Sequence, residues 1–207
     1  MNRTQQRQNS KRGRRTLLRV VCVILALLIL AASLSGCIAN RPLRLSQLRE
    51  FERKVHSKYP LASVSCKYAY GADVAIDVSR VTVDEESAYT ILGYLRPIVS
   101  GEDFLNDFLE FFEEEKQKHP KWQMERPPDI YLNLDGGTIC HYQFTTRAYT
   151  QNYDDVQGTY IYTWDGYTTW YGGITLFHGS GYKDIEYQEI YADEIEEALK
   201  KYSQEQD

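Results

Sequence analysis

Residues 130–146 read IYLNLDGGTICHYQFTT, and this stretch decides the fold class. Apolar and polar side chains alternate over Ile130–Leu134 and again over Thr138–Thr146, on either side of Asp135–Gly137. Alternation with a period of two indicates half-buried strands, and a short glycine-containing segment between two such runs indicates a hairpin. We therefore expect two antiparallel strands with one face on a hydrophobic core.

Two further hairpins are predicted in the same way. The apolar residues of 64–70 and 74–78 face the same side when a three-residue loop, Gly71–Asp73, sets Tyr68 against Ile76. Later, Thr159–Trp164 and Tyr167–Tyr171 flank Asp165-Gly166, which suits the two central positions of a type I′ turn. Residues 174–178 are expected to add another strand, and 151–158 to form a loop.

Four helices are predicted around these strands, from apolar residues that recur every three or four positions. They cover 43–58, 82–96, 100–119 and 189–202. Thr82 and Glu85 have the spacing of a capping box, and Pro97 is expected to stop the second helix. Because hairpins rather than crossovers join the predicted strands, we expect an α+β domain with a mainly antiparallel sheet and helices packed on one face.

The N-terminal 36 residues differ in composition from the rest of the chain. They contain seven basic residues and no acidic residue, followed by an apolar run over Val20–Ala32. This run is shorter than the roughly 20 apolar residues that a membrane-spanning helix needs. A basic start, a short apolar stretch and small residues after it are typical of a secretory signal peptide.

The segment Leu34-Ser35-Gly36-Cys37 resembles the lipobox of bacterial lipoproteins. The resemblance implies cleavage after residue 36 and a diacylglycerol thioether on Cys37, which would hold the chain at the outer face of the cell membrane, or at the outer membrane in a host with two membranes. An uncleaved signal anchor would leave the chain on the same side. We thus expect a signal peptide (1–36), a short lipidated tether (37–42) and one extracytoplasmic domain (43–207).

Removal of the signal peptide leaves 17 basic and 29 acidic residues, a net charge of −12. Such an acidic chain is a poor candidate for nucleic-acid binding, which needs a basic surface. Basic residues nevertheless crowd the segment 41–58, beside the expected anchor. This segment is either attracted to an anionic bilayer or is an ordinary solvated helix face.

Two cysteines, Cys66 and Cys140, remain in the mature domain, and both lie in strand-like stretches. A compartment outside the cytoplasm permits a disulfide between them. Alternatively, each is a buried thiol that packs as a small apolar side chain. Their spacing favours neither possibility.

No catalytic motif, metal-binding spacing or cofactor motif is recognisable. The four histidines do not form a helical pair of zinc ligands, and neighbouring residues such as Cys140 and His141 point to opposite faces of a strand. Two functional classes remain. The first is a non-catalytic module that binds an envelope glycan, a peptide or a membrane protein, and the second is a hydrolase or transferase of envelope polymers whose site is not visible in the sequence.

Aromatic residues between 142 and 187 supply the positive hypothesis for function. If Asp165-Gly166 is a hairpin turn, one face of the resulting ribbon carries Tyr160, Tyr162, Trp164, Tyr167 and Tyr171. Tyrosine has a flat apolar ring with a polar tip, which suits a solvated binding surface. The alternative is that this face is the core, since aromatic residues also favour strands. Exposure of at least three of these side chains as one contiguous surface would support binding.

Overall fold

The structure is a computed structural model that describes residues 40–69, 73–120, 124–135, 140–177 and 185–204. The predicted signal peptide, the lipobox and Cys37 lie outside these residues. Within the described ranges, none of the helices combines the length and the apolar character needed to cross a membrane.

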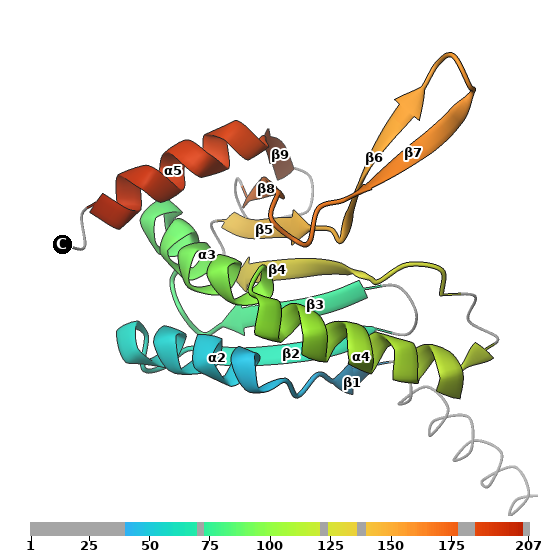
Figure 1. Ribbon diagram of the computed structural model, residues 1–207. Helices are drawn as coiled ribbons and strands as arrows, with labels where there is room; N and C mark the ends of the chain where they lie inside the picture. The colour runs from blue at the N-terminus through green and yellow to red at the C-terminus, as the bar shows by residue number, and fades with distance from the viewer. Residues whose placement is uncertain (1–39, 70–72, 121–123, 136–139, 178–184, 205–207) are drawn as a thin grey trace, which may run out of the picture. The chain divides into compact units, whose positions relative to one another are not determined.

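Four helices and nine strands are described (Figure 1). In chain order they are β1 (Asn40–Pro42), α2 (Ser46–Lys58), β2 (Ser63–Ala69), β3 (Asp73–Ser79), α3 (Glu85–Val99), α4 (Glu102–Lys118), β4 (Asp129–Asp135), β5 (Cys140–Thr146), β6 (Tyr149–Asp154), β7 (Thr159–Trp164), β8 (Trp170–Phe177), β9 (Ile185–Ile190) and α5 (Ala192–Gln204).

Seven of the strands form one sheet in the order β1-β2-β3-β4-β5-β8-β9, and β6 pairs only with β7. The pairs β2–β3, β4–β5 and β8–β9 are antiparallel, as is β5–β8. The fold is therefore α+β with a mainly antiparallel sheet, as predicted. The expectation of hairpins alone is wrong at one place, because α3 and α4 form a crossover that makes β3 and β4 parallel.

The helices pack on one face of the sheet and leave the other face open (Figure 1). Alternate residues of β4, namely Ile130, Leu132 and Leu134, are fully buried on the helix side, as predicted from the opening stretch. Phe104 and Phe108 of α4 join the same core. Burial of such side chains contributes roughly 1.5–3 kcal/mol each, so this shared apolar face holds the two layers together.

Three predicted helix boundaries need correction. Helix α3 begins at Glu85 rather than Thr82, because the Asp84 side chain accepts a hydrogen bond from Ser87 N–H and caps the helix. Pro97 lies in the last turn of α3, where a missing N–H removes only one backbone hydrogen bond. Helix α5 begins at Ala192, because the residues before it form β9.

The predicted β2–β3 pairing has the right faces but the wrong register. Tyr68 pairs with Val74, whereas we expected Tyr68 to pair with Ile76. The difference is two residues, and an even shift leaves each side chain on the same face of the sheet. Residues 70–72, between the two strands, lie outside the described residues.

The structure places Cys66 and Cys140 too far apart for a disulfide, and both are free thiols. Cys66 lies in β2 and Cys140 in β5, with β3 and β4 between them. Three strand spacings of about 4.8 Å separate their backbones by ~14 Å, twice the Cα separation of about 7 Å that a disulfide tolerates. The structure thus favours the alternative of two separately packed thiols.

Candidate binding surface

Strands β5 to β8 form one long antiparallel ribbon with a break in the middle. Thr146 pairs with Trp170 below the break, and Tyr149 pairs with Trp164 above it. Residues 147–148 span the break on one strand and residues 165–169 on the other. Because one side has more residues than the other, the break is a bulge. The prediction that Asp165-Gly166 joins two paired strands is wrong: the hairpin tip is the turn 155–158, and β7 pairs with β6.

The bulge is held by Asp165. Its carboxylate accepts hydrogen bonds from the backbone N–H groups of Thr168 and Thr169, at 2.9 and 3.0 Å, and from both threonine hydroxyls. Burial alone would raise the pKa of Asp165, but these hydrogen bonds outweigh burial and lower that pKa. Asp165 and Gly166 also donate backbone N–H bonds to the Ala148 carbonyl, so both sides of the break are tied together.

The bulge turns Tyr167 into the core. Gly166 and Tyr167 both have left-handed backbones, with φ of 61°, a conformation that glycine adopts without strain and tyrosine does not. The Tyr167 side chain is fully buried, and its hydroxyl donates a hydrogen bond of 2.9 Å to the Pro128 carbonyl. Burial raises the pKa of this hydroxyl far above its usual value. Tyr167 is therefore structural and cannot bind a ligand at the surface.

Beyond the bulge, β6 and β7 extend away from the main sheet as a two-stranded hairpin (Figure 1). Every residue of β7 is exposed, so neither face of the hairpin is core. The register brings five aromatic residues to one face, which we call the hairpin aromatic face. They are Tyr149, Tyr153, Tyr160, Tyr162 and Trp164.

The hairpin aromatic face is ordered by contacts between its own rings. Tyr149 and Trp164 meet edge to face at 5.1 Å between ring centroids, as do Tyr153 and Tyr160. The guanidinium of Arg126 lies 3.6 Å from the centroid of the Tyr162 ring. A cation over an aromatic ring is attracted to its electron-rich face, so Arg126 restrains Tyr162 without a helix over it.

A cleft of about 250 Å³ lies at the foot of the hairpin, which we call the junction cleft. Tyr149, Gln151 and Tyr162 line its hairpin side, and Arg126 and Arg147 lie on the side of the domain. Aromatic rings, an amide, two guanidinium groups and the carboxylate of Asp129 thus line one hollow, where the rings offer stacking and the polar groups offer hydrogen bonds.

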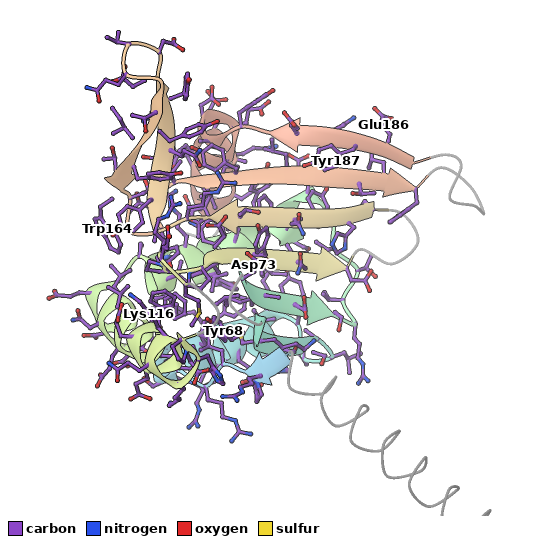
Figure 2. All side chains as sticks on the ribbon, turned by 90° about the vertical axis from the view of Figure 1, so that its right-hand side faces the viewer. Tyr68, Asp73, Lys116, Trp164, Glu186 and Tyr187 are labelled. Atoms are coloured by element: carbon purple, nitrogen blue, oxygen red, sulfur yellow. The ribbon has the colours of Figure 1, made fainter. Side chains whose placement is uncertain are left out.

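A second cleft, of about 330 Å³, lies on the open face of the main sheet and shares Arg147 with the first. Four tyrosines line it, and we call it the tyrosine cleft: Tyr131, Tyr171, Tyr187 and Tyr191. Gly173 gives it depth, because a Cβ there would lie 2.6 Å from the ring of Tyr187. Figure 2 shows Trp164 near the foot of the hairpin and Tyr187 on β9.

Two carboxylates lie side by side near the shared arginine. Asp73 and Asp129 pair on the parallel strands β3 and β4, and Arg147 donates a 3.1 Å hydrogen bond to Asp129. Burial raises the pKa of Asp73, as does the negative charge of Asp129. Burial also raises the pKa of Asp129, against the opposing effect of Arg147. Within the described part of the chain, no group of three or more metal-ligating side chains gathers that could hold a metal ion.

The structure separates the five aromatic residues that the sequence placed on one ribbon face. Tyr160, Tyr162 and Trp164 are 53%, 39% and 47% exposed on the hairpin, and Tyr171 is 43% exposed in the tyrosine cleft. Tyr167 is buried. Three of the predicted rings, Tyr160, Tyr162 and Trp164, are therefore exposed on one face of the hairpin, although the predicted register is wrong. Sequence reasoning missed Tyr149 and Tyr153 because it placed most of β6 in a loop, and it missed Tyr187 because it overlooked β9.

Comparison with known protein families, with curated proteins and with solved structures finds no match for this chain.

Proposed function

We propose that this chain is a lipid-anchored protein of the bacterial cell envelope that binds glycan chains without transforming them, and that the hairpin aromatic face is its binding surface. The carrying observation is the exposure of Tyr160, Tyr162 and Trp164 on a hairpin outside the core. A ligand that covers this exposed apolar surface removes it from water, which favours binding. A contiguous exposed patch of this kind usually marks an interaction site.

The chemistry of the surface favours a glycan. Flat rings such as Tyr162 and Trp164 stack on the apolar faces of sugar rings, while tyrosine hydroxyls and the amide of Gln151 hydrogen-bond to sugar hydroxyls. The junction cleft is next to these rings and adds Arg126 and Arg147. A long ribbon with rings on one face suits a chain-like ligand better than a compact one.

The test is retention of the purified full-length chain on isolated cell-wall glycan. Trp164→Ala is expected to weaken retention about tenfold, equivalent to about 1.4 kcal/mol. Ile161→Ala is the matched control, because Ile161 is on the same strand, equally exposed at 47%, and on the opposite face. Equal retention of the two variants would reject the hairpin aromatic face as the binding surface.

A second arm separates glycan from peptide. Enzymatic removal of the peptides attached to the wall glycan is expected to leave retention unchanged, because the stacking partners are sugar rings. Loss of retention after this treatment would identify a peptide ligand and overturn the glycan assignment.

The alternative class, a hydrolase of envelope polymers, is favoured by one observation, the neighbouring carboxylates Asp73 and Asp129 with raised pKa values. Glycoside hydrolysis needs two carboxyl groups on either side of the bond that breaks. Our proposal expects no release of reducing ends during incubation with wall glycan. Release that disappears in Asp129→Asn would favour the hydrolase instead.

A further inference from the structure

Charge is distributed unevenly along the mature domain. Between residues 41 and 58 there are six basic and two acidic residues, whereas residues 59–207 contain 11 basic and 27 acidic residues. The basic segment forms β1 and α2, which lie together at the lower edge of the view in Figure 1. The basic segment therefore lies at one edge of an otherwise acidic domain, where Gln47 and Arg41 contact Asp107 and Glu115 of α4.

Helix α2 directs this charge into solvent. Leu48, Phe51 and Val55 pack on the core, which leaves Arg49 and Arg53 on the opposite side of the helix, one turn apart. Together with Arg44, which precedes the helix and is also exposed, they form what we call the basic patch. The two acidic residues of α2 already have partners, Glu50 with Lys54 at 2.9 Å and Glu52 with His56 at 3.8 Å.

The described residues provide no carboxylate within 4 Å of Arg44, Arg49 or Arg53. Arg53 also interacts electrostatically with Glu50, whose main partner is Lys54. The guanidinium groups of the basic patch thus remain largely available to an external anion. Guanidinium groups bind phosphate well, because their planar fork of donors matches its oxygen atoms.

The start of the domain is firmly attached to its body. Arg41 forms an ion pair of 3.3 Å with Glu115, a carboxylate of α4 that is almost completely buried. Lys118 and His119 also lie within 4 Å of this carboxylate. Cys37 precedes Arg41 by four residues, which span at most about 14 Å when fully extended. A lipid on Cys37 would therefore hold this edge close to the membrane.

We propose that the edge formed by β1 and the basic patch rests on the surface of an anionic phospholipid bilayer. This inference rests on the lipid anchor of the proposed function. Basic side chains within reach of anionic headgroups are attracted to them, and the acidic remainder of the domain is repelled. In the sheet, β5 and β8 are four and five strands away from β1, so the hairpin stands about 20 Å or more from the membrane-facing edge. The hairpin aromatic face is then presented to the envelope rather than to the lipid.

The test uses the full-length lipidated chain in vesicles of phosphatidylcholine, with and without phosphatidylglycerol. A fluorophore is attached at Ser57→Cys on α2 or at Val156→Cys at the tip of the hairpin, and quenching by a headgroup-linked quencher is measured. Labelling of the parent chain gives the background from Cys66 and Cys140. In anionic vesicles we expect quenching to be several-fold stronger at position 57 than at position 156.

Charge reversal tests the role of the basic patch. Arg53→Glu is expected to reduce the contrast between the two labels, whereas Lys200→Glu, the same change on α5, is expected to leave it intact. The contrast should also shrink in vesicles without phosphatidylglycerol.

Equal quenching of the two labels on a chain that remains bound to vesicles would overturn the proposed orientation and leave the anchor intact. A contrast that neither Arg53→Glu nor the loss of anionic lipid alters would overturn the role of the basic patch. Failure of the parent chain to stay with the vesicles would reject the anchor itself, and with it this inference.

Discussion

At the scale of single residues, the bulge between β7 and β8 decides which aromatic rings are available. Asp165 organises the bulge through its carboxylate, and Gly166 allows the left-handed backbone that follows. As a result Tyr167 enters the core while Tyr171 emerges on the open face of the sheet. Tyr167 is thus buried and Tyr171 exposed, because the carboxylate of Asp165 fixes the path of the backbone between them.

Substitution of this carboxylate gives a prediction with a defined pH dependence. Asp165→Asn removes the charge and replaces one accepting oxygen by a donor, which should lower the free energy of unfolding by about 1–2 kcal/mol at neutral pH. Because hydrogen bonds lower the pKa of Asp165, its contribution is present above the unfolded-state pKa and is lost as pH falls through the lower folded-state value. The difference between wild type and variant should therefore narrow below about pH 4. Urea unfolding at several pH values measures it, with Asp155→Asn in the exposed tip as the control.

Substitution of Gly172 or Gly173, adjacent residues of β8, by alanine is expected to change the stability of the domain to different extents. A Cβ on Gly172 would lie 2.8 Å from the buried ring of Phe144, so Gly172→Ala should destabilise the domain by about 1–3 kcal/mol. A Cβ on Gly173 would meet Tyr187, which is 61% exposed and can swing into solvent. Gly173→Ala should therefore leave the unfolding midpoint nearly unchanged. Equal destabilisation of both variants would contradict this assignment of the two faces.

At the scale of elements, the hairpin β6–β7 depends on the ribbon that it continues. A single two-stranded hairpin is marginally stable in water, and β6 and β7 pair with none of the other strands that the structure describes. Three contacts support the hairpin: the pairing of β5 with β8 below the bulge, the backbone hydrogen bonds to the Ala148 carbonyl, and the guanidinium of Arg126 over the Tyr162 ring. The aromatic rings can thus remain exposed because the main sheet, and not their own burial, supports the hairpin.

Strand order also predicts the chemistry of the two cysteines. If the chain is cleaved and lipidated at Cys37 as proposed, unfolding it in urea without reductant should expose two reactive thiols, Cys66 and Cys140, since β3 and β4 keep them apart. In the folded chain both should react slowly, because burial raises both pKa values, that of Cys66 to about 12. The thiolate, which is the reactive form, is therefore scarce in the folded chain at pH 8. Detection of no thiol after unfolding would show a disulfide.

At the scale of the whole domain, strand order places the basic patch and the hairpin aromatic face at separate parts of the sheet. The basic patch is at the β1 edge of the sheet, and the hairpin leaves the sheet between β5 and β8. The open face, with the tyrosine cleft, is opposite the helices. The proposed binding surface is thus directed away from the edge that we propose to face the membrane.

The anchor itself is tested on the intact cell. Metabolic labelling with a fatty-acid analogue should tag the wild-type chain and not Cys37→Ala, because only that cysteine can form the diacylglycerol thioether that the lipobox resemblance implies. Cys66→Ala is the control and should be labelled like the wild type. Label on Cys37→Ala would show that the resemblance misleads.

The sequence by itself determined what depends on neighbouring residues. Alternation over 130–146 predicted β4, β5 and their pairing, and apolar stripes predicted the helices to within a few residues at most ends. Such patterns depend only on which side of a strand or helix a residue faces. The predicted register of β2 and β3 was wrong by two residues, but each side chain still faces the predicted side of the sheet.

Only the tertiary structure decided which strands pair and therefore which rings are exposed. Asp165-Gly166 has the residues of a hairpin turn, but the same preference for a left-handed backbone also suits a bulge. Strand pairing decides between the turn and the bulge: β7 pairs with β6, whereas β8 pairs with β5 and β9, so Asp165-Gly166 lies in a bulge. Pairing over such distances along the chain depends on competition among whole strands, which no local pattern contains. For this reason the tyrosine cleft, the junction cleft and the burial of Tyr167 became visible only in the folded domain.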